Sequence, residues 1–303
     1  MGLCKSRNIG VNYLTTHKDK IVSKSEVQGF YWNPAKQEID LDCLQGVSAI
    51  INLAGTSISK RWTADNKSKI ITSRLDALRT LHSALEKVDT TKIISFVSAS
   101  AIGIYPNSLT KFYEEDEKGT DESFLGAVVK RWEAETDTFD HFDFPVAKIR
   151  IGLVMSAKGG ALTEMAKPIH YYMGAAFGSG EQWQSWIHIA DLARMFLFVI
   201  DNGLNGIYNG VGPNPVTNYK LVREIAIALD KPILLPNIPR FVLKSVLGEM
   251  SYLLFASQRV CSKKIEEEGF IFAYQNIGKT LEKIYSGDPM ENGVDSVYNQ
   301  EYI

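Results

Sequence analysis

The chain has 303 residues, 45% of them apolar and 22% charged, enough to bury the core of one domain or of one domain with an added lobe. Its 33 basic and 35 acidic residues give a net charge of −2, which excludes the basic surface of nucleic-acid-binding proteins. No apolar run approaches the roughly 20 residues of a membrane span, and residues 1–20 lack the apolar stretch of a secretory signal. Cys4, Cys43 and Cys261 are far apart in sequence, which favours reduced thiols over disulfides or a metal site, so we expect a cytoplasmic protein without a metal.

Strands and helices alternate in the first half of the chain. Near-continuous apolar runs predict buried strands at residues 11–15, 29–32, 47–53, 93–97 and 146–154. Apolar residues at three- and four-residue spacing from Ile71 to Leu85 predict a helix, and a second helix fits residues 124–139. Strands apolar on both faces that alternate with helices predict a doubly wound parallel α/β sheet.

The alternation of predicted strands and helices ends after residue 155. A glycine-rich stretch at 159–180 precedes predicted helices at 189–200, 219–229, 241–255 (a buried one) and within 263–285. We therefore predict a truncated dinucleotide-binding domain at 1–155, to which 190–212 contributes, and a substrate lobe with a helical C-terminal domain at 156–285. The polar tail at 286–303 has no period and is expected to be disordered.

Several polar residues lie where predicted strands end. Asn52-Leu53-Ala54-Gly55 follows one strand, and the carboxyl ends of parallel strands are where α/β sheets bind ligands. Ser98 and Ser100 end the next strand, where a hydroxyl can bind a substrate. Tyr105 could be an acid or base if a lysine such as Lys130 lowers its pKa. The alternatives are a tight turn, a helix cap with a buried phenol, and a solvated lysine.

The order of motifs resembles that of extended short-chain dehydrogenase/reductases, the NAD-dependent epimerase/dehydratase superfamily. The closer similarity is to the atypical "epimerase family protein" subgroup, which carries a small C-terminal domain of unknown function. The matching segments are Trp32-Asn33-Pro34, NLAG at 52–55, Lys60-Arg61-Trp62, SASA at 98–101, KRWE at 130–133, GSGEQWQSWIH at 178–188, PNPVTN at 213–218, LGEM at 247–250 and QRV at 258–260.

Three departures from this pattern limit what the resemblance implies. The family's first strand and glycine-rich loop have no counterpart before Ile9, and Gly126 stands where the family's catalytic YxxxK has tyrosine, with Lys130 retained. Gln184 stands where nucleotide-sugar epimerases have an arginine that binds the diphosphate. A neutral amide cannot replace a bidentate guanidinium there, so a nucleotide-sugar substrate is not expected.

The resemblance implies NADP as the cofactor, because the loop after the first visible strand has no carboxylate until Asp19 and so admits a 2′-phosphate. The residues expected to bind the cofactor are Thr15, Thr16, Lys18, Asn52, Leu53, Ala54, Gly55, Arg74, Ser98, Lys130 and Arg150.

The missing first strand has a physical consequence. In a doubly wound sheet this strand is central, so its absence leaves two inner edges with unpaired backbone groups, each costing about 1–3 kcal/mol when buried. We expect that Met1 lies inside a longer reading frame or that the product is a damaged copy. We also expect the chain as written to bind NADP(H) poorly, because the phosphate-binding amides are absent.

The segment 178–189 is expected to fold over the reactive end of the cofactor, with Gln182, Trp183, Gln184 and Trp186 around a small substrate pocket. The alternative is that both tryptophans are core between the two domains. His188 and Asp191 are expected to orient the lobe and cap its helix.

Two functions remain open. The first is an NADP-dependent epimerase/dehydratase-like oxidoreductase, a monomer or homodimer acting on an unknown small molecule, with Ser100, Tyr105 and Lys130 as catalytic residues; without the phosphate loop it could be inactive as written. The alternative is a non-catalytic nucleotide-binding or regulatory protein on the same fold, which the resemblance links to division. The absent tyrosine favours the alternative, and Ser100 and Lys130 favour the enzyme.

Overall fold

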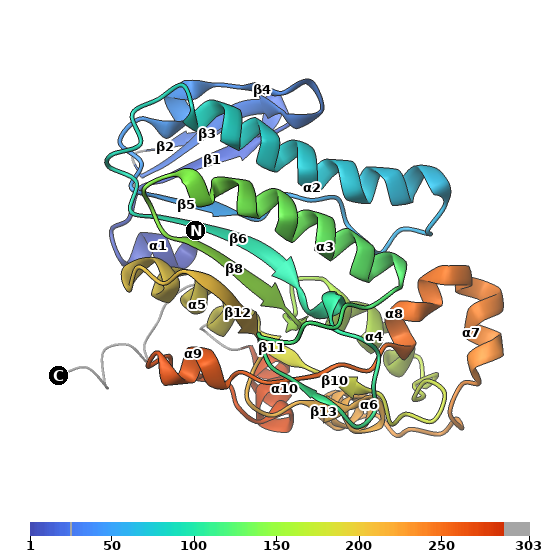
Figure 1. The fold of residues 1–303 in the computed structure, drawn as a ribbon. Coiled ribbons are helices and arrows are strands. Elements are labelled where there is room, and N and C mark those ends of the chain that lie inside the picture. Colours follow the sequence, from blue (N-terminus) through green and yellow to red (C-terminus); the bar gives the residue numbers. More distant parts are fainter. Residues whose placement is uncertain (25, 288–303) are drawn as a thin grey trace.

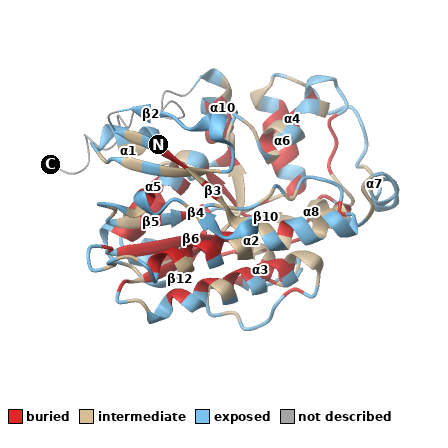
Figure 2. Ribbon diagram, turned by 90° about the horizontal axis from the view of Figure 1, so that it is seen from above, coloured by how far each residue is buried: buried red, intermediate tan, exposed pale blue. Residues whose placement is uncertain are grey.

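A four-stranded parallel sheet forms the centre of the computed structural model, which describes residues 1–24 and 26–287 (Figure 1). Its strand order is β12-β8-β6-β5. The four strands are β5 (Ala49–Asn52), β6 (Ser95–Ala101), β8 (Val146–Ile151) and β12 (Gly206–Gly210). Every residue of β6 except Ala101 is buried, as expected of a strand that is covered on both faces (Figure 2).

A second, smaller sheet holds the N-terminal strands. Its members are β1 (Val11–Thr15), β2 (Ser23–Lys24), β3 (Val27–Asn33) and β4 (Glu38–Ile39). β1 runs parallel to β3 and has no other partner among the described residues, and β5 pairs only with β6. The short helix α1 (Gly2–Ser6) precedes β1 and contributes Leu3 and Cys4 to the central core. Both β1 and β5 therefore present an unpaired edge, as the strand-order argument predicts.

Helices cover both faces of the central sheet. On one face α2 (Ala64–Leu85) and α3 (Phe124–Thr136) lie side by side, and α5 (Ile189–Asp201) packs on the opposite face (Figures 1 and 2). Thr63 and Ser123 begin α2 and α3 by accepting hydrogen bonds from the backbone N–H groups of Asn66 and Gly126. The apolar stripe of α2 packs on the sheet, with Leu78, Leu81 and Leu85 buried.

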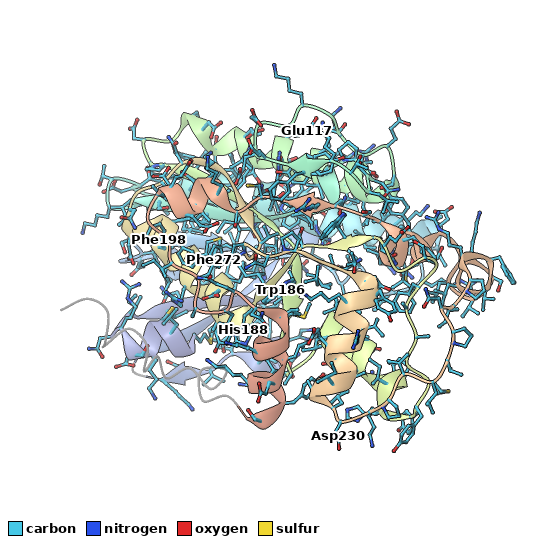
Figure 3. All side chains as sticks on the ribbon, turned by 90° about the horizontal axis from the view of Figure 1, so that it is seen from below. Glu117, Trp186, His188, Phe198, Asp230 and Phe272 are labelled. Atoms are coloured by element: carbon cyan, nitrogen blue, oxygen red, sulfur yellow. The ribbon has the colours of Figure 1, made fainter. Side chains whose placement is uncertain are left out.

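The second half of the chain forms its own core. β9 (Leu153–Met155) pairs with β11 (Trp186–His188), and β10 (Trp183–Gln184) pairs with β13 (Val216–Thr217). The surrounding helices are α4 (Ala161–His170), α6 (Asn218–Ala228) and α10 (Ile277–Ser286). Trp186 is fully buried in this core with Leu221 and Leu281 (Figure 3).

The C-terminal segment returns to the first half of the chain. β14 (Arg259–Val260) runs parallel to β7 (Phe112–Tyr113), close to α7 (Arg240–Leu247), α8 (Tyr252–Phe255) and α9 (Lys263–Glu267) in the chain. The described 3-10 helices are η1 (Lys18–Lys20), η2 (Pro34–Lys36), η3 (Leu41–Leu44), η4 (Ile102–Ile104), η5 (Asp137–His141) and η6 (Gly248–Ser251).

The structure corrects three expectations about these elements. The buried helix expected at 241–255 is wrong: it breaks at Gly248, which has φ +60°, and α7 is exposed, with Phe241 74% accessible (Figure 2). The run at 146–154 is two strands that separate at Gly152, where an added Cβ would overlap the carbonyl oxygen of Ser185. The final helix extends to Ser286, and the rest of the expected disordered tail, from residue 288, lies outside the described residues.

None of the helices in the described part of the chain has both the length and the apolar character needed to cross a lipid bilayer.

Candidate functional site

A cleft of about 200 Å³ opens at the carboxyl ends of β6 and β8. Both halves of the chain line it: the ends of β6 and β8, one face of α3, Arg74 from α2, and residues of β10 and α8. Most of its wall is apolar, and the polar side chains are Arg74, Gln184, Ser185 and Gln258 besides the two indole groups. A concave apolar site with few polar groups, at the carboxyl edge of a parallel sheet, is the usual form of a small-molecule site in an α/β protein.

Of the four residues expected around the substrate, the structure brings two to this cleft. Trp183 is partly exposed and lines it together with Gln184; its indole N–H donates to the carbonyl oxygen of Leu109. Gln182 is buried outside the cleft and donates to two backbone carbonyl oxygens, and Trp186 is fully buried and donates to the carbonyl oxygen of Asn214. These two residues pack the interior instead of facing a ligand.

Ser100 and Tyr105 belong to a buried polar network and do not line the cleft. Ser100, only 2% exposed, donates to Glu133 Oε1 at 2.6 Å. Arg150 binds the same carboxylate through Nε and Nη2, both at 2.8 Å. Its Nη1 donates to the Tyr105 hydroxyl at 3.0 Å, and that hydroxyl donates to Asn209 Oδ1 at 2.7 Å. Every one of these groups is hydrogen-bonded within the protein, which is how buried polar groups are stabilised.

The chemistry expected of Tyr105 is at odds with this environment. Burial raises the pKa of the Tyr105 phenol to about 12, although Arg150 and Asn209 act in the opposite direction. A phenol with a raised pKa holds its proton at neutral pH, whereas the sequence analysis required a lowered pKa. Lys130 does not change this, because it is exposed on α3 and the structure does not bring it to Tyr105, Ser100 or the cleft.

A close backbone contact at Gly126 explains why no tyrosine stands at that point of α3. An added Cβ would overlap the carbonyl oxygen of Asp121, so no larger side chain fits without a backbone shift. The face of α3 that lines the cleft consists instead of Leu125, Val128, Val129 and Trp132.

The residues expected to bind the cofactor lie in separate places. Asn52 is buried and donates to Ser98 Oγ at 3.1 Å, which ties the end of β5 to β6, whereas the next residue, Leu53, is 64% exposed. Arg150 is occupied by Glu133: burial alone would lower its pKa, but its hydrogen bonds raise it above the ordinary value. The structure therefore gives Ser98 and Arg150 internal partners.

The loop after β1 contains the residues expected at the adenosine end of the cofactor. Thr16 and Lys18 are exposed, and Thr15 Oγ1 accepts the backbone N–H of His17. Arg74, which is also expected to bind the cofactor, lies in the cleft, where its side chain packs against Gly55 and the ring of Trp132.

His188 and Asp191 have the structural roles expected of them. His188 Nδ1 accepts the N–H of Ala190 at the start of α5, and its ring stacks on Tyr274 (Figure 3). Asp191 accepts the N–H groups of Ala273 and Tyr274 and an N–H of Arg194, which fixes the C-terminal segment against α5.

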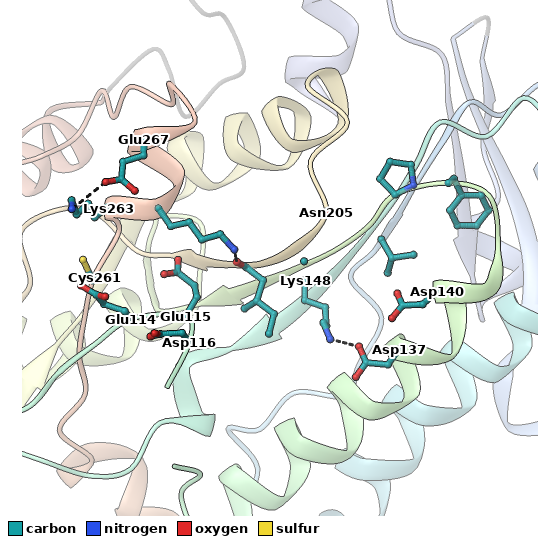
Figure 4. A pocket seen from close by; sticks show the side chains of 16 residues that line it. Glu114, Glu115, Asp116, Asp137, Asp140, Lys148, Asn205, Cys261, Lys263 and Glu267 are labelled. Atoms are coloured by element: carbon teal, nitrogen blue, oxygen red, sulfur yellow. Dashed lines mark hydrogen bonds and ion pairs between the residues drawn. The ribbon is translucent and has the colours of Figure 1, made fainter. Parts of the chain in front are cut away.

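A larger hollow, of about 840 Å³, lies elsewhere, beside the first residues of β8 and β12 (Figure 4). Charged side chains line it, and several are paired with one another: Lys148 binds Asp137, and Lys263 lies 3.1 Å from Glu267. Since this hollow is not at the carboxyl edge of the sheet, where α/β proteins bind ligands, we place the functional site in the smaller cleft.

One group of side chains among the described residues could hold a metal ion. The ligand atoms of His82, Glu86 and His141 all lie within 4.8 Å of one another. The group lies on the last turns of α2 and on η5, and none of its members lines the cleft. It is a separate surface feature.

Much of the cleft wall was not predicted from the sequence, including Trp132 and Leu253. Glu133, which binds Ser100 and Arg150 in the buried network, was not predicted either. The KRWE motif contained a signal for Glu133, since a buried carboxylate needs a cation and Arg150 lies on a neighbouring strand. Leu253 comes from α8, more than 100 residues from α3 in sequence, and no local pattern indicates that contact.

Parallel strands with helices on both faces and a cleft at their carboxyl edge define a Rossmann-like protein of the short-chain dehydrogenase/reductase type. The chain belongs to the NAD dependent epimerase/dehydratase family, whose profile matches residues 37–210. Residues 238–284 match a domain of unknown function, DUF1731. The resemblance inferred from the motifs, including the small C-terminal domain, is thereby confirmed.

Relatives cover almost the whole chain. An epimerase family protein of Staphylococcus aureus (strain MRSA252) is 34% identical over 283 residues, 93% of each chain, and the epimerase family protein YfhF of Bacillus subtilis is 36% identical over 242 residues, 80% of this chain and 79% of YfhF. The human epimerase family protein SDR39U1, solved with NADPH, superposes with a TM-score of 0.81 at 25% identity and covers 94% of this chain and 95% of its own. UDP-glucuronic acid 4-epimerase from Bacillus cereus shares the fold, with a TM-score of 0.73 at 14% identity over 94% and 92% of the two chains.

Proposed function

We propose that this protein is an NADP(H)-dependent oxidoreductase of the epimerase/dehydratase type whose substrate is a small molecule other than a nucleotide sugar. The observation that carries the proposal is the cleft at the carboxyl ends of β6 and β8, which both halves of the chain enclose. Gln184 lines this cleft with a neutral amide, which does not offer the charge that a nucleotide-sugar diphosphate requires.

The preference for NADP rests on the loop after β1. It presents the hydroxyl groups of Thr15 and Thr16 and the ammonium of Lys18, and no carboxylate lies before Asp19. A carboxylate at this point would bind the ribose hydroxyls of NAD, whereas a hydroxyl-bearing and basic loop admits a 2′-phosphate. The NADPH bound to the human relative supports the same choice, although the Bacillus cereus epimerase was solved with NAD.

The described residues fit one end of such a cofactor and not its centre. The β1 loop suits the phosphorylated ribose, but no described strand or glycine-rich turn lies between β1 and β5 to hold the pyrophosphate. The cofactor, when bound, supplies the hydride. The chain's own residues bind the substrate and exclude water from it.

A second function, non-catalytic binding of a nucleotide or small molecule, has its own support. Ser100 and Tyr105 are held in the buried network, and Arg74 is the one ionisable residue among the described residues of the cleft wall. An arginine does not exchange protons near neutral pH, so the cleft has no evident general acid or base.

Cofactor titration tests the first function. We expect the chain to bind NADPH weakly, and a version with a strand and glycine-rich loop from a relative joined ahead of Ile9 to bind it at least tenfold more tightly, because the edges of β1 and β5 would then flank a phosphate site. Replacing Lys18 by Gln in that version should reduce NADPH affinity and leave NADH affinity unchanged.

Calorimetry with both cofactors measures these affinities. Equal binding of NADH and NADPH by the extended chain would contradict the NADP preference. Binding of NADPH without consumption of it in the presence of carbonyl substrates would favour the non-catalytic function.

A further inference from the structure

Arg74 is a cation without an anionic partner at the wall of an apolar cleft. Its Nη1 donates to the carbonyl oxygens of Thr56 and Ile70, at 3.2 and 2.8 Å. Its Nε is buried and makes no hydrogen bond, and neither bond to a carbonyl uses Nη2. No carboxylate of the described residues lies within ion-pair distance of it.

Arg74 is half-buried, and partial burial of a charge without a counterion is unfavourable. Desolvation lowers the pKa of the Arg74 guanidinium from its ordinary value. Part of the charge faces the ring of Trp132, whose centre lies 4.9 Å away, but a cation–π contact does not satisfy N–H donors. By contrast Arg150, which is buried, has a bidentate carboxylate partner in Glu133.

Nη2 is the part of the Arg74 guanidinium that is left for a ligand, because Nη1 is hydrogen-bonded to two carbonyl oxygens and Nε has almost no exposed surface. The two N–H groups of Nη2 can donate to an anion. Around it the cleft wall is apolar, from Ile102, Leu125 and Val129, and Gln184 supplies an amide. The volume of about 200 Å³ accommodates a ligand of one ring with a short substituent.

We propose that Arg74 is the anion-binding residue of the cleft and that the cleft takes a small carboxylate with a flat apolar body. The carboxylate accepts from Nη2 of Arg74, and the flat body packs between Trp132 and the apolar wall. A single cation matches a monoanion better than a phosphate, because the lining residues supply no second positive charge. This substrate class rests on the proposed function only in placing the substrate in this cleft.

Calorimetric titration with benzoate, benzamide and phenyl phosphate tests the proposal on the full chain. Benzamide has the same shape as benzoate without the charge, and phenyl phosphate distinguishes a carboxylate site from a phosphate site. The variants are Arg74→Gln and Arg74→Lys, with Arg79→Gln as the matched control, because Arg79 lies on the same helix and is half exposed and paired with Glu135.

The expected result is benzoate binding that weakens at least tenfold in Arg74→Gln and less in Arg74→Lys, with Arg79→Gln unchanged and benzamide binding weakly to every variant. Thermal unfolding of each variant shows that it is folded. A Gly55→Ala variant gives a second measure, because its Cβ would lie 3.0 Å from Arg74 Cζ and displace the guanidinium, so it should also weaken benzoate binding.

Equal benzoate affinity in wild type and Arg74→Gln, tighter binding of phenyl phosphate than of benzoate, or equal binding of benzamide would each overturn the proposal. Absence of binding by all three probes would overturn it as well. Failure of the proposed function is seen separately: benzoate binding that depends on Arg74, without NADPH binding by the extended chain, contradicts the NADP-dependent function and leaves this site in place.

Discussion

Glu133 accepts three hydrogen bonds in the buried network. Its two oxygens accept from Ser100 and twice from Arg150, and both members of the ion pair are under one-tenth exposed. A buried ion pair adds little net stability compared with apolar packing, but removal of one partner leaves the other charged and without a counterion. Ser100 is thus a structural hydroxyl in this arrangement, whatever role the family motif implies for it.

We expect Glu133→Gln to lower the free energy of unfolding by about 3–5 kcal/mol, because Arg150 would remain charged and buried without a carboxylate. The double variant Glu133→Gln with Arg150→Met should recover part of that loss. Urea denaturation measures both. If Glu133→Gln is as stable as wild type, burial of Arg150 without its carboxylate partner does not destabilise the fold.

Glu115 makes the free energy of unfolding depend on pH. Burial raises the pKa of its carboxyl group above the ordinary value, although the N–H of Asn209 and the charges of Lys264 and Arg150 act in the opposite direction. A carboxyl group with a raised pKa in the folded state favours folding below the pKa of the unfolded chain, and this contribution is lost as pH rises through the folded pKa.

Glu115→Gln is therefore expected to be more stable than wild type at pH 7, with the difference shrinking as pH falls below about 4, where the carboxyl group is neutral in both states. Urea unfolding of both proteins from pH 3.5 to pH 8 measures the difference. A variant less stable than wild type at neutral pH would mean that the charged carboxylate contributes net stability there.

At the level of elements, α3 gives the cleft an apolar wall. Leu125, Val129 and Trp132 recur at helical spacing and face the cleft, whereas Lys130 lies on the exposed side. The cation of the site therefore comes from α2, as Arg74, and not from α3. The first turn of α3 is held against the segment before it, since Gly126 lies against the backbone of Asp121.

Gly126→Ala tests this contact. Glycine to alanine inside a helix normally adds about 0.5–1 kcal/mol of stability, but here the Cβ would overlap the Asp121 carbonyl oxygen, so we expect a loss of more than about 1 kcal/mol. The matched control is Gly10→Ala, where no atom lies within 4 Å of the added Cβ. Equal stability of the two variants would show that the start of α3 moves freely.

At the level of the whole molecule, two described strands each have one edge without a partner strand. β1 and β5 each have one partner among the described strands, and Ile51 of β5 is partly exposed although it lies in the middle of a strand. The core nevertheless includes residues from both sheets, such as Leu14 and Ile50, so side-chain packing links them without backbone pairing.

Hydrogen exchange should reveal these edges. In a parallel strand alternate amides point to opposite neighbours, so about half the amides of β5 and of β1 lack a ladder partner. We expect those amides to exchange fast and the amides of β6, which has partners on both sides, to exchange slowly. Uniform protection across β5 and β6 would show that the β5 edge is covered in solution.

The sequence by itself determined the type and order of most elements. The apolar runs at 11–15, 29–32, 47–53 and 93–97 each overlap a strand, and the spacing from Ile71 to Leu85 lies within α2. The motifs identified the family because many weak signals in a fixed order are specific together. Apolar runs alone gave wrong boundaries at Gly152, where one strand run divides, and at Gly248, where a helix breaks.

The tertiary structure alone decided which polar residues face a ligand. Ser100, Tyr105 and Arg150 are polar residues near strand ends, but Glu133 binds Ser100 and Arg150, and Tyr105 is bonded to Arg150 and Asn209. The contacts of Glu133 join α3 to β6 and β8. Arg74 differs from these residues, because no carboxylate pairs with it and its side chain lines the cleft. Local sequence fixes backbone conformation through nearest neighbours, whereas the partner of a buried charge comes from residues distant in sequence, so only the folded chain shows whether a charge is already paired.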